Sequence, residues 1–149
     1  MKKNEFTELK ILLLGHSDSN KTQILHKFIN NSFENNNSNT IGVDFECKPI
    51  EYKDKKYLIK LFDTAGQERF QSITKSYYRM GDGFFIVFDM TNEDTLKSVT
   101  KLIESIIEEI EDAKIIILGN NCELKDKLIP DDIIKQYVGE YKFINSFFF

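Results

Sequence analysis

Residues 15–22 read GHSDSNKT and place a glycine, a lysine and a threonine at a spacing that could hold phosphate. Loops of the form G-x-x-x-x-G-K-[ST] bind phosphate through backbone N–H groups and the lysine, while the final hydroxyl binds Mg²⁺. Lys21 and Thr22 stand where this pattern needs them, but Asn20 replaces the second glycine. Asparagine adopts positive φ angles more readily than most residues, so this is a mild replacement in a loop that needs φ > 0. The segment therefore predicts an altered phosphate-binding loop.

The elements around this loop alternate between strand and helix patterns. Continuous apolar runs predict four buried strands, because both faces of each are apolar; they are 9–15, 57–63, 83–89 and 114–120. Pro49 assigns a fifth strand, 43–52, to an edge of the sheet. Apolar residues at helical spacing predict helices over 21–29, 96–110 and, after Pro130, 131–141.

Alternating strands and helices are typical of an α/β fold with a mostly parallel, doubly wound sheet. Ligands in such sheets bind beyond the carboxyl ends of the strands. Gly15, Asp63 and Asn120 end three of the predicted strands. We therefore expect the phosphate-binding loop to face the polar residues that follow the other two strands.

Bulk properties exclude several other classes of protein. The chain has 149 residues, enough for one domain over 1–149, and a net charge of -4 argues against nucleic-acid binding. There is no run of 18 apolar residues and no apolar stretch near the N-terminus, so neither a transmembrane segment nor a signal peptide is expected. Two widely separated cysteines suit a reducing cytoplasm. We expect a soluble, cytoplasmic protein.

Several strings together resemble one family. DTAGQERF (63–70), TIGVDF (40–45), SYYR (76–79) and GNNCEL (119–124), with GHSDSNKT, resemble the Rab branch of the Ras superfamily of small GTPases. The resemblance runs from about Leu9 to Ser146. It implies the P-loop small-GTPase fold, GTP or GDP with Mg²⁺ as ligands, and slow GTP hydrolysis in vesicle and membrane trafficking.

The resemblance also implies a role for each matching residue. The phosphate loop would comprise Gly15, His16, Ser17, Asp18, Ser19 and Asn20, with Lys21 bridging the β- and γ-phosphates. Mg²⁺ would be bound by Thr22, Thr40 and Asp63. Gly66 would contact the γ-phosphate and Gln67 would orient the attacking water. The guanine base would meet Asn120, Asn121 and Glu123. Effectors and exchange or activating proteins would contact Ile41, Gly42, Phe45, Phe62 and Tyr77.

The departures from the family pattern lie mostly in the nucleotide motifs. Besides Asn20, the loop has His16 for aspartate, Asp18 for glycine and Ser19 for valine. Asp18 places a carboxylate near phosphate, whereas His16 is expected to be a surface residue without a role of its own. The family's N-K-x-D reads Asn120-Asn121-Cys122-Glu123, so the lysine is lost and the acid is one methylene longer.

The C-terminal sequence departs from the pattern as well. The family's S-A-K motif, its final helix and its prenylated cysteine tail have no counterpart after Ser146. We therefore expect a C-terminally truncated domain without a direct lipid anchor. Two alternatives to an active GTPase stay open: a catalytically dead interaction module that presents a Rab-like effector face, and a fragment without a cellular role.

Overall fold

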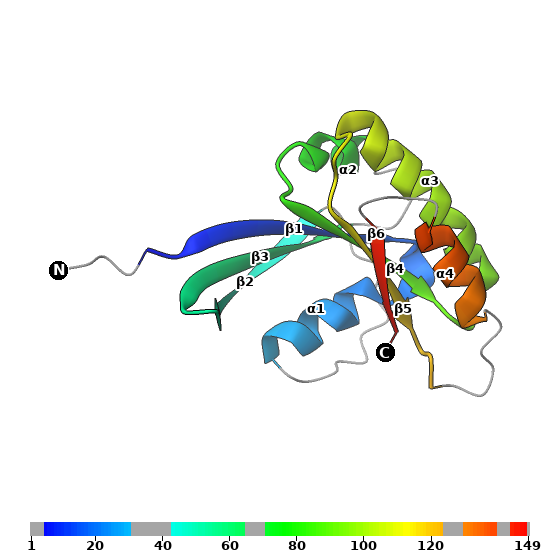
Figure 1. Cartoon of the computed structure of the whole chain (residues 1–149), viewed down its shortest axis with the longest axis horizontal. Helices are drawn as coiled ribbons and strands as arrows, with labels where there is room; N and C mark the ends of the chain where they lie inside the picture. The colour runs from blue at the N-terminus through cyan, green and yellow to red at the C-terminus, as the bar shows by residue number, and fades with distance from the viewer. Residues whose placement is uncertain (1–4, 31–42, 65–70, 124–129, 140–143, 149) are drawn as a thin grey trace.

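Six strands form one sheet in the order β2-β3-β1-β4-β5-β6 (Figure 1). The computed structural model describes residues 5–30, 43–64, 71–123, 130–139 and 144–148. The strands are β1 (Thr7–Gly15), β2 (Val43–Tyr52), β3 (Lys55–Thr64), β4 (Gly83–Asp89), β5 (Ile115–Asn120) and β6 (Ile144–Phe148). Only β2 and β3 pair in an antiparallel manner, and the other neighbours are parallel. This confirms the predicted α/β fold with a mostly parallel sheet.

Four α-helices and one short 3₁₀ helix connect the strands. They are η1 (Ser17–Ser19), α1 (Lys21–Asn30), α2 (Gln71–Tyr78), α3 (Glu93–Glu109) and α4 (Asp131–Gly139). The α3 helix begins three residues before the predicted apolar stripe, because the Asn92 side chain accepts the Asp94 N–H at 3.0 Å and caps the helix. The α2 helix was not predicted from sequence. None of the helices in the described segments is long and apolar enough to cross a lipid bilayer.

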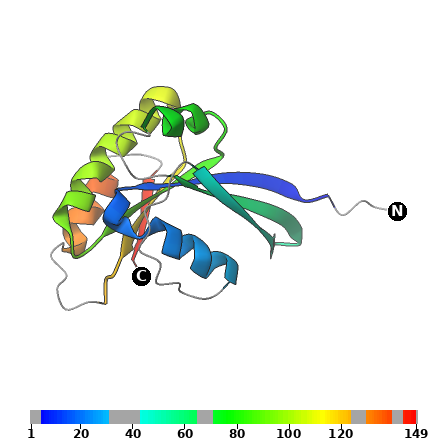
Figure 2. The ribbon, with the colours of Figure 1, turned by 180° about the vertical axis from the view of Figure 1, so that it is seen from behind.

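The helices cover the two faces of the sheet unequally (Figures 1 and 2). α2, α3 and α4 contribute to the larger core, which surrounds the β4 and β5 side chains Phe84, Ile86, Ile115 and Ile117. Among the described helices, α1 alone contributes to the smaller core on the opposite face, through Leu25 and its neighbours. Phe85 of β4 points to that second face and is only partly buried. The two faces therefore differ in how completely their apolar side chains are covered.

The sheet register brings the predicted site residues to one edge. Gly15 is paired with Val87, Asp63 with Leu13, and Asn120 with Asp89. Parallel strands end at the same side of a sheet, so the carboxyl ends of β1, β3 and β5 lie at the same side. The predicted site residues on these strands therefore share that side of the sheet.

The β2–β3 hairpin is tied to the α1 helix by one lysine. Lys48 Nζ donates a hydrogen bond to the Phe28 carbonyl oxygen at 2.5 Å and lies 4.8 Å from the centre of the Phe28 ring. A cation at the C-terminal end of a helix binds carbonyl oxygens that have no partner within the helix. Lys48 therefore fixes the end of α1 against the edge strand.

Candidate functional site

Gly15 ends β1 in a conformation that suits glycine. Its φ angle is 147°, and a Cβ atom at this position would lie 2.2 Å from the Val87 carbonyl oxygen and 2.9 Å from Ser19 Oγ. Any side chain would therefore push the loop away from β4. The lack of a Cβ atom lets residues 16–20 fold back closely over the ends of β1 and β4.

Asn20 joins the η1 turn to the α1 helix in the left-handed region. Its φ and ψ angles are 61° and 34°. The condition under which asparagine is a mild replacement for glycine, a positive φ angle, is therefore met at this position. Asparagine meets this need at a smaller cost than most other side chains, although at a greater cost than glycine. The replacement of the glycine therefore leaves the backbone turn before Lys21 in place.

Lys21 is the most deeply buried cation described at the site, with 5% of its surface exposed. Its Nζ donates to the carbonyl oxygens of Gly15, at 3.0 Å, and His16, at 2.9 Å. Burial lowers the pKa of Lys21 to about 8, and the charges of Asp63 and Asp18 act in the opposite direction. An ammonium has three N–H donors, so two hold the loop and the third can serve another acceptor.

Thr22 and Asp63 bring two oxygen ligands together. Thr22 Oγ1 donates a hydrogen bond to Asp63 Oδ2, which links the start of α1 to the end of β3. Asp63 is 1% exposed, and the next residue, Thr64, donates through Oγ1 to the Leu13 carbonyl oxygen at 2.8 Å. Hydroxyl and carboxylate oxygens are the ligands that Mg²⁺ prefers. The pair therefore has the chemistry of a magnesium site beside the lysine.

His16 takes part in the loop structure, contrary to the expectation that it has no role. Its Nδ1 accepts the backbone N–H of Asp18 at 3.2 Å, and its carbonyl oxygen accepts the N–H of Ser19 at 3.1 Å and the Ser19 hydroxyl at 2.7 Å. The Asp18 carboxylate is largely exposed and accepts a 3.4 Å hydrogen bond from Ser17 Oγ. The expectation was wrong because the turn geometry and the side-chain rotamer, which residue type does not reveal, place the imidazole next to the Asp18 N–H.

Comparison with known proteins identifies the family. The model of the Ras family matches residues 10–146. The chain belongs to the Ras family. It is 43% identical over 121 residues to Ras-related protein Rab-10 of Caenorhabditis elegans. The aligned region covers 80% of this chain and 60% of that protein.

Two further relatives show the same relationship. The chain is 36% identical to GTP-binding protein YPT1 of Saccharomyces cerevisiae over 135 residues, 89% of this chain and 66% of YPT1. It is 41% identical to human Ras-related protein Rab-8B over 119 residues, 79% of this chain and 58% of Rab-8B. The chain is thus a Rab-like small GTPase domain by sequence. The matched region is about 60% of the length of these relatives.

The segment that would meet the base in a Ras-family protein makes several hydrogen bonds within the chain. Asn120 Nδ2 donates to the Ser19 carbonyl oxygen at 3.5 Å and so connects the end of β5 to the phosphate loop. Asn121, which replaces the family's lysine, has φ 61° and donates through Nδ2 to Asp89 Oδ2 at 2.9 Å. Glu123 is exposed. The side chain of Asn121 is therefore held by Asp89 at the end of β4.

Asp89 was missed by the sequence reasoning. Its carboxylate accepts from Asn121, and also from the Thr91 N–H at 2.8 Å and the Thr91 hydroxyl at 2.7 Å. An acidic residue at the end of a buried strand was the available signal, because Asp63 has the same position on β3. Five predicted residues lie outside the described residues, so their placement stays a prediction; these are Thr40, Ile41, Gly42, Gly66 and Gln67.

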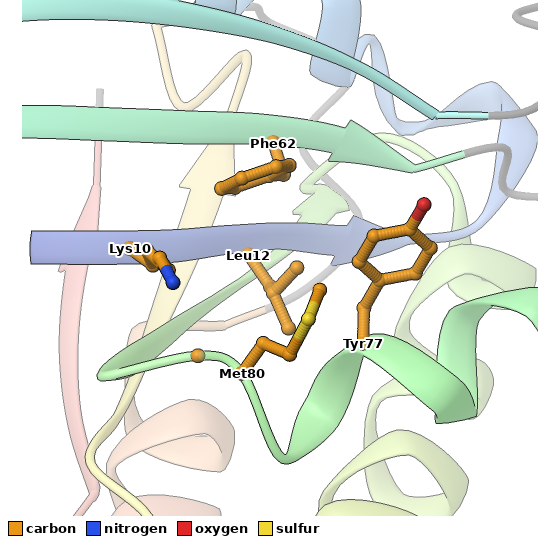
Figure 3. Close-up of a pocket in the computed structure, with 6 residues that line it drawn as sticks. Lys10, Leu12, Phe62, Tyr77 and Met80 are labelled. Carbon is orange, nitrogen blue, oxygen red and sulfur yellow. The ribbon is translucent and has the colours of Figure 1, made fainter.

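Three aromatic residues form a surface next to the strands. Phe45 stacks on Phe62 with ring centres 5.3 Å apart, and Phe62 lies 6.3 Å from Tyr77. Phe45 is 56% exposed. Phe62 and Tyr77 also line a shallow, open depression, which Figure 3 shows with Leu12, Met80 and Lys10 around it. The structure thus brings together the three aromatic residues predicted to contact effectors.

Proposed function

We propose that this chain binds GDP and GTP together with Mg²⁺ and hydrolyses GTP slowly, as a Rab-type domain of the trafficking machinery. The observation that carries this proposal is the position of Lys21. Its buried ammonium group lies at the start of α1, on two loop carbonyl oxygens and near the Thr22–Asp63 pair. A lysine, a helix N-terminus and oxygen ligands for Mg²⁺ at one place form the chemical requirements of a phosphate site.

Different residues of this chain would bind the phosphates, bind Mg²⁺ and position the attacking water. Lys21 supplies positive charge to the phosphates, and the first N–H groups of α1 point along the helix axis toward the same region. Thr22 and Asp63 would hold Mg²⁺, which neutralises phosphate charge when bound. Gln67 is proposed to orient the attacking water. Hydrolysis is expected to be slow on its own, because a partner's arginine accelerates such reactions by roughly 10³–10⁵-fold.

The base pocket is proposed to be weak and poorly selective. Selectivity for guanine needs a carboxylate that accepts two hydrogen bonds at once, and Glu123 carries its carboxylate one methylene further out. Asn121 is too short to lie along a base as a lysine would, and its amide is bound to Asp89. We therefore expect weak guanine-nucleotide binding with a reduced preference over adenine nucleotides.

Titration calorimetry with GDP and ADP in the presence of Mg²⁺ tests the proposal. Glu123→Asp should tighten GDP by roughly ten- to a hundredfold and ADP much less, because it restores a hydrogen bond to the base. Asn20→Gly should tighten both nucleotides about equally, because it acts where the loop meets phosphate. Lys21→Ala should abolish binding of both. A GDP-to-ADP ratio that Glu123→Asp leaves unchanged would place the base elsewhere, and binding that survives Lys21→Ala would contradict the phosphate site.

A second function is favoured by the aromatic surface. Phe45 stacks on Phe62 and Phe62 lies beside Tyr77, and none of the three is among the residues proposed to bind nucleotide. An exposed aromatic group of this kind suits a protein partner. The chain could therefore act as an interaction module even if it hydrolyses nothing. The discriminating result is binding of a Rab effector that is lost in Phe45→Ala and retained in Lys21→Ala.

The cellular setting is part of the same proposal. The relatives are named Rab proteins, and the chain spans only part of their length, so its role in vesicle trafficking is inferred from them. Both cysteines, Cys47 and Cys122, are free thiols. Free thiols suit the reducing cytoplasm, where we place the protein.

A further inference from the structure

The phosphate loop is closed on itself by His16. Four donors of the loop end on this residue: the Asp18 N–H on the imidazole Nδ1, and the Ser19 N–H, the Ser19 hydroxyl and Lys21 Nζ on the carbonyl oxygen. The backbone bonds maintain the η1 turn. The imidazole bond is different, because it depends on the side chain at position 16.

The Asp18 N–H is one of the backbone donors that a loop of this type turns toward phosphate. In this protein the donor already has an acceptor, 3.2 Å away on a neighbouring side chain. Phosphate can gain this hydrogen bond only by displacing the imidazole. Because the competitor is part of the same loop, its effective concentration is fixed and does not fall when the protein is diluted, so phosphate must compete with it at every protein concentration.

The surroundings of His16 allow the imidazole to leave. Its side chain is 35% exposed, so it can move into solvent without breaking a packed core. A carboxylate oxygen, Asp18 Oδ2, lies 3.6 Å from Nδ1, and the Asp18 side chain is 65% exposed. The hydrogen bond between Nδ1 and the Asp18 N–H is thus a local contact that can open separately from the rest of the site.

We propose that the His16 side chain is an intramolecular competitor of nucleotide phosphate. It accepts the Asp18 N–H while the loop is free of ligand and releases it when phosphate binds. This inference rests on the proposed nucleotide site. An ordinary neutral hydrogen bond of this kind changes an equilibrium by about two- to tenfold, so His16 weakens phosphate binding by that factor.

Two variants separate this role from a general effect on the loop. His16→Ala removes the acceptor. His16→Asn keeps an acceptor, because its Oδ1 occupies nearly the position of Nδ1 and asparagine is a favoured capping residue. The other histidine of the chain, His26, lies in α1 outside the loop, so His26→Ala serves as the matched control.

Hydrogen exchange of the Asp18 amide in nucleotide-free protein gives a readout that needs no ligand. Protection should be present in the unmodified protein, in His16→Asn and in His26→Ala, and lost in His16→Ala. Calorimetry with GDP and Mg²⁺ then gives the second readout. His16→Ala should bind GDP about two- to tenfold more tightly, whereas the other two variants should match the unmodified protein.

The outcomes separate the two proposals. Equal GDP affinity of the unmodified protein and His16→Ala overturns the competitor and leaves the nucleotide site intact. An unprotected Asp18 amide in the unmodified protein also overturns the competitor. Absence of GDP binding in the unmodified protein, His16→Ala and Glu123→Asp overturns the nucleotide site and, with it, the competitor.

Discussion

At the scale of single residues, Lys21 combines a functional position with an energetic cost. Its ammonium is buried, and this burial lowers its pKa from the ordinary value of 10.5 to about 8. Desolvation opposes the charged form, and two carbonyl oxygens and two carboxylates compensate for it only in part. A phosphate would add the missing negative charge. The buried lysine therefore lowers the stability of the ligand-free protein and, in the same position, can bind an anion.

The pH dependence of stability follows from this lowered pKa. Below about pH 8, Lys21 is protonated in both the folded and the unfolded chain. Between about pH 8 and 10.5, the unfolded chain binds the additional proton, so the free energy of unfolding should rise with pH. The contribution should be on the order of 1–3 kcal/mol. Urea unfolding of nucleotide-free protein at pH 7 and pH 9.5 measures it.

The control for this prediction is a lysine whose side chain is exposed. Lys21→Met should remove the rise, whereas Lys101→Met, at an exposed position of α3, should retain it. The quantity to compare is the difference between each variant and the unmodified protein at the two pH values. If the free energy of unfolding of Lys21→Met rises by the same amount between the two pH values, the effect comes from another titratable group.

At the scale of elements, the end of α1 depends on a residue from the edge strand. The sequence has five lysines between residues 48 and 60. Two of them connect the hairpin to other elements: Lys48 binds the Phe28 carbonyl oxygen, and Lys60 pairs with Glu8 at 2.8 Å. The Lys60 charge and hydrogen bond lower the pKa of Glu8. The hairpin is therefore attached to α1 through Lys48 and to β1 through Lys60.

Replacing Lys48 should loosen α1 from its C-terminal end. Lys48→Met keeps the apolar stem against the Phe28 ring but removes the ammonium. We expect the free energy of unfolding to fall by about 1 kcal/mol and amide exchange to accelerate at residues 27–30. Lys55→Met, on the exposed part of the same hairpin, should change neither. Unchanged exchange at the end of α1 in Lys48→Met would show that the cap contributes nothing in solution.

At the scale of the whole molecule, the two faces of the sheet are covered to different extents. Adjacent residues of β4 show this difference: Phe84 is 1% exposed in the larger core, whereas Phe85 is only partly buried on the face of α1. Ile116 of β5 is partly buried on that face too. Apolar surface left in this way favours contact with another protein surface.

The two phenylalanines form a matched pair for a test of this asymmetry. Phe84→Ala should cost about 3–5 kcal/mol of stability, because it leaves a cavity in a closed core. Phe85→Ala should cost less than half as much and should reduce concentration-dependent self-association, measured by sedimentation velocity. Equal costs for the two substitutions would mean that the face of α1 is covered in solution.

The sequence by itself determined most of the strands and helices, although not α2, and also the mostly parallel sheet and the place of the phosphate loop along the chain. These features depend on the spacing of apolar residues along the chain and on a motif of contiguous residues, so they can be recognised without knowing the tertiary structure. Asn20 has the positive φ angle under which asparagine is a mild replacement for the glycine of the motif. Strand ends were less predictable: β1 begins at Thr7, before its apolar run, because Thr7 and Glu8 are paired with Tyr57 and Leu58 of β3.

Only the tertiary structure decided how the site residues are engaged. The bond between Asn121 and Asp89 joins residues 32 positions apart, and the bond between Thr22 and Asp63 joins residues 41 apart. Such pairs depend on strand register, which no local pattern specifies. The burial that lowers the Lys21 pKa likewise depends on β3 and the loop closing over the start of α1. Even the short-range contact of His16 with the Asp18 N–H required the loop geometry, because a side-chain rotamer is chosen by the fold around it.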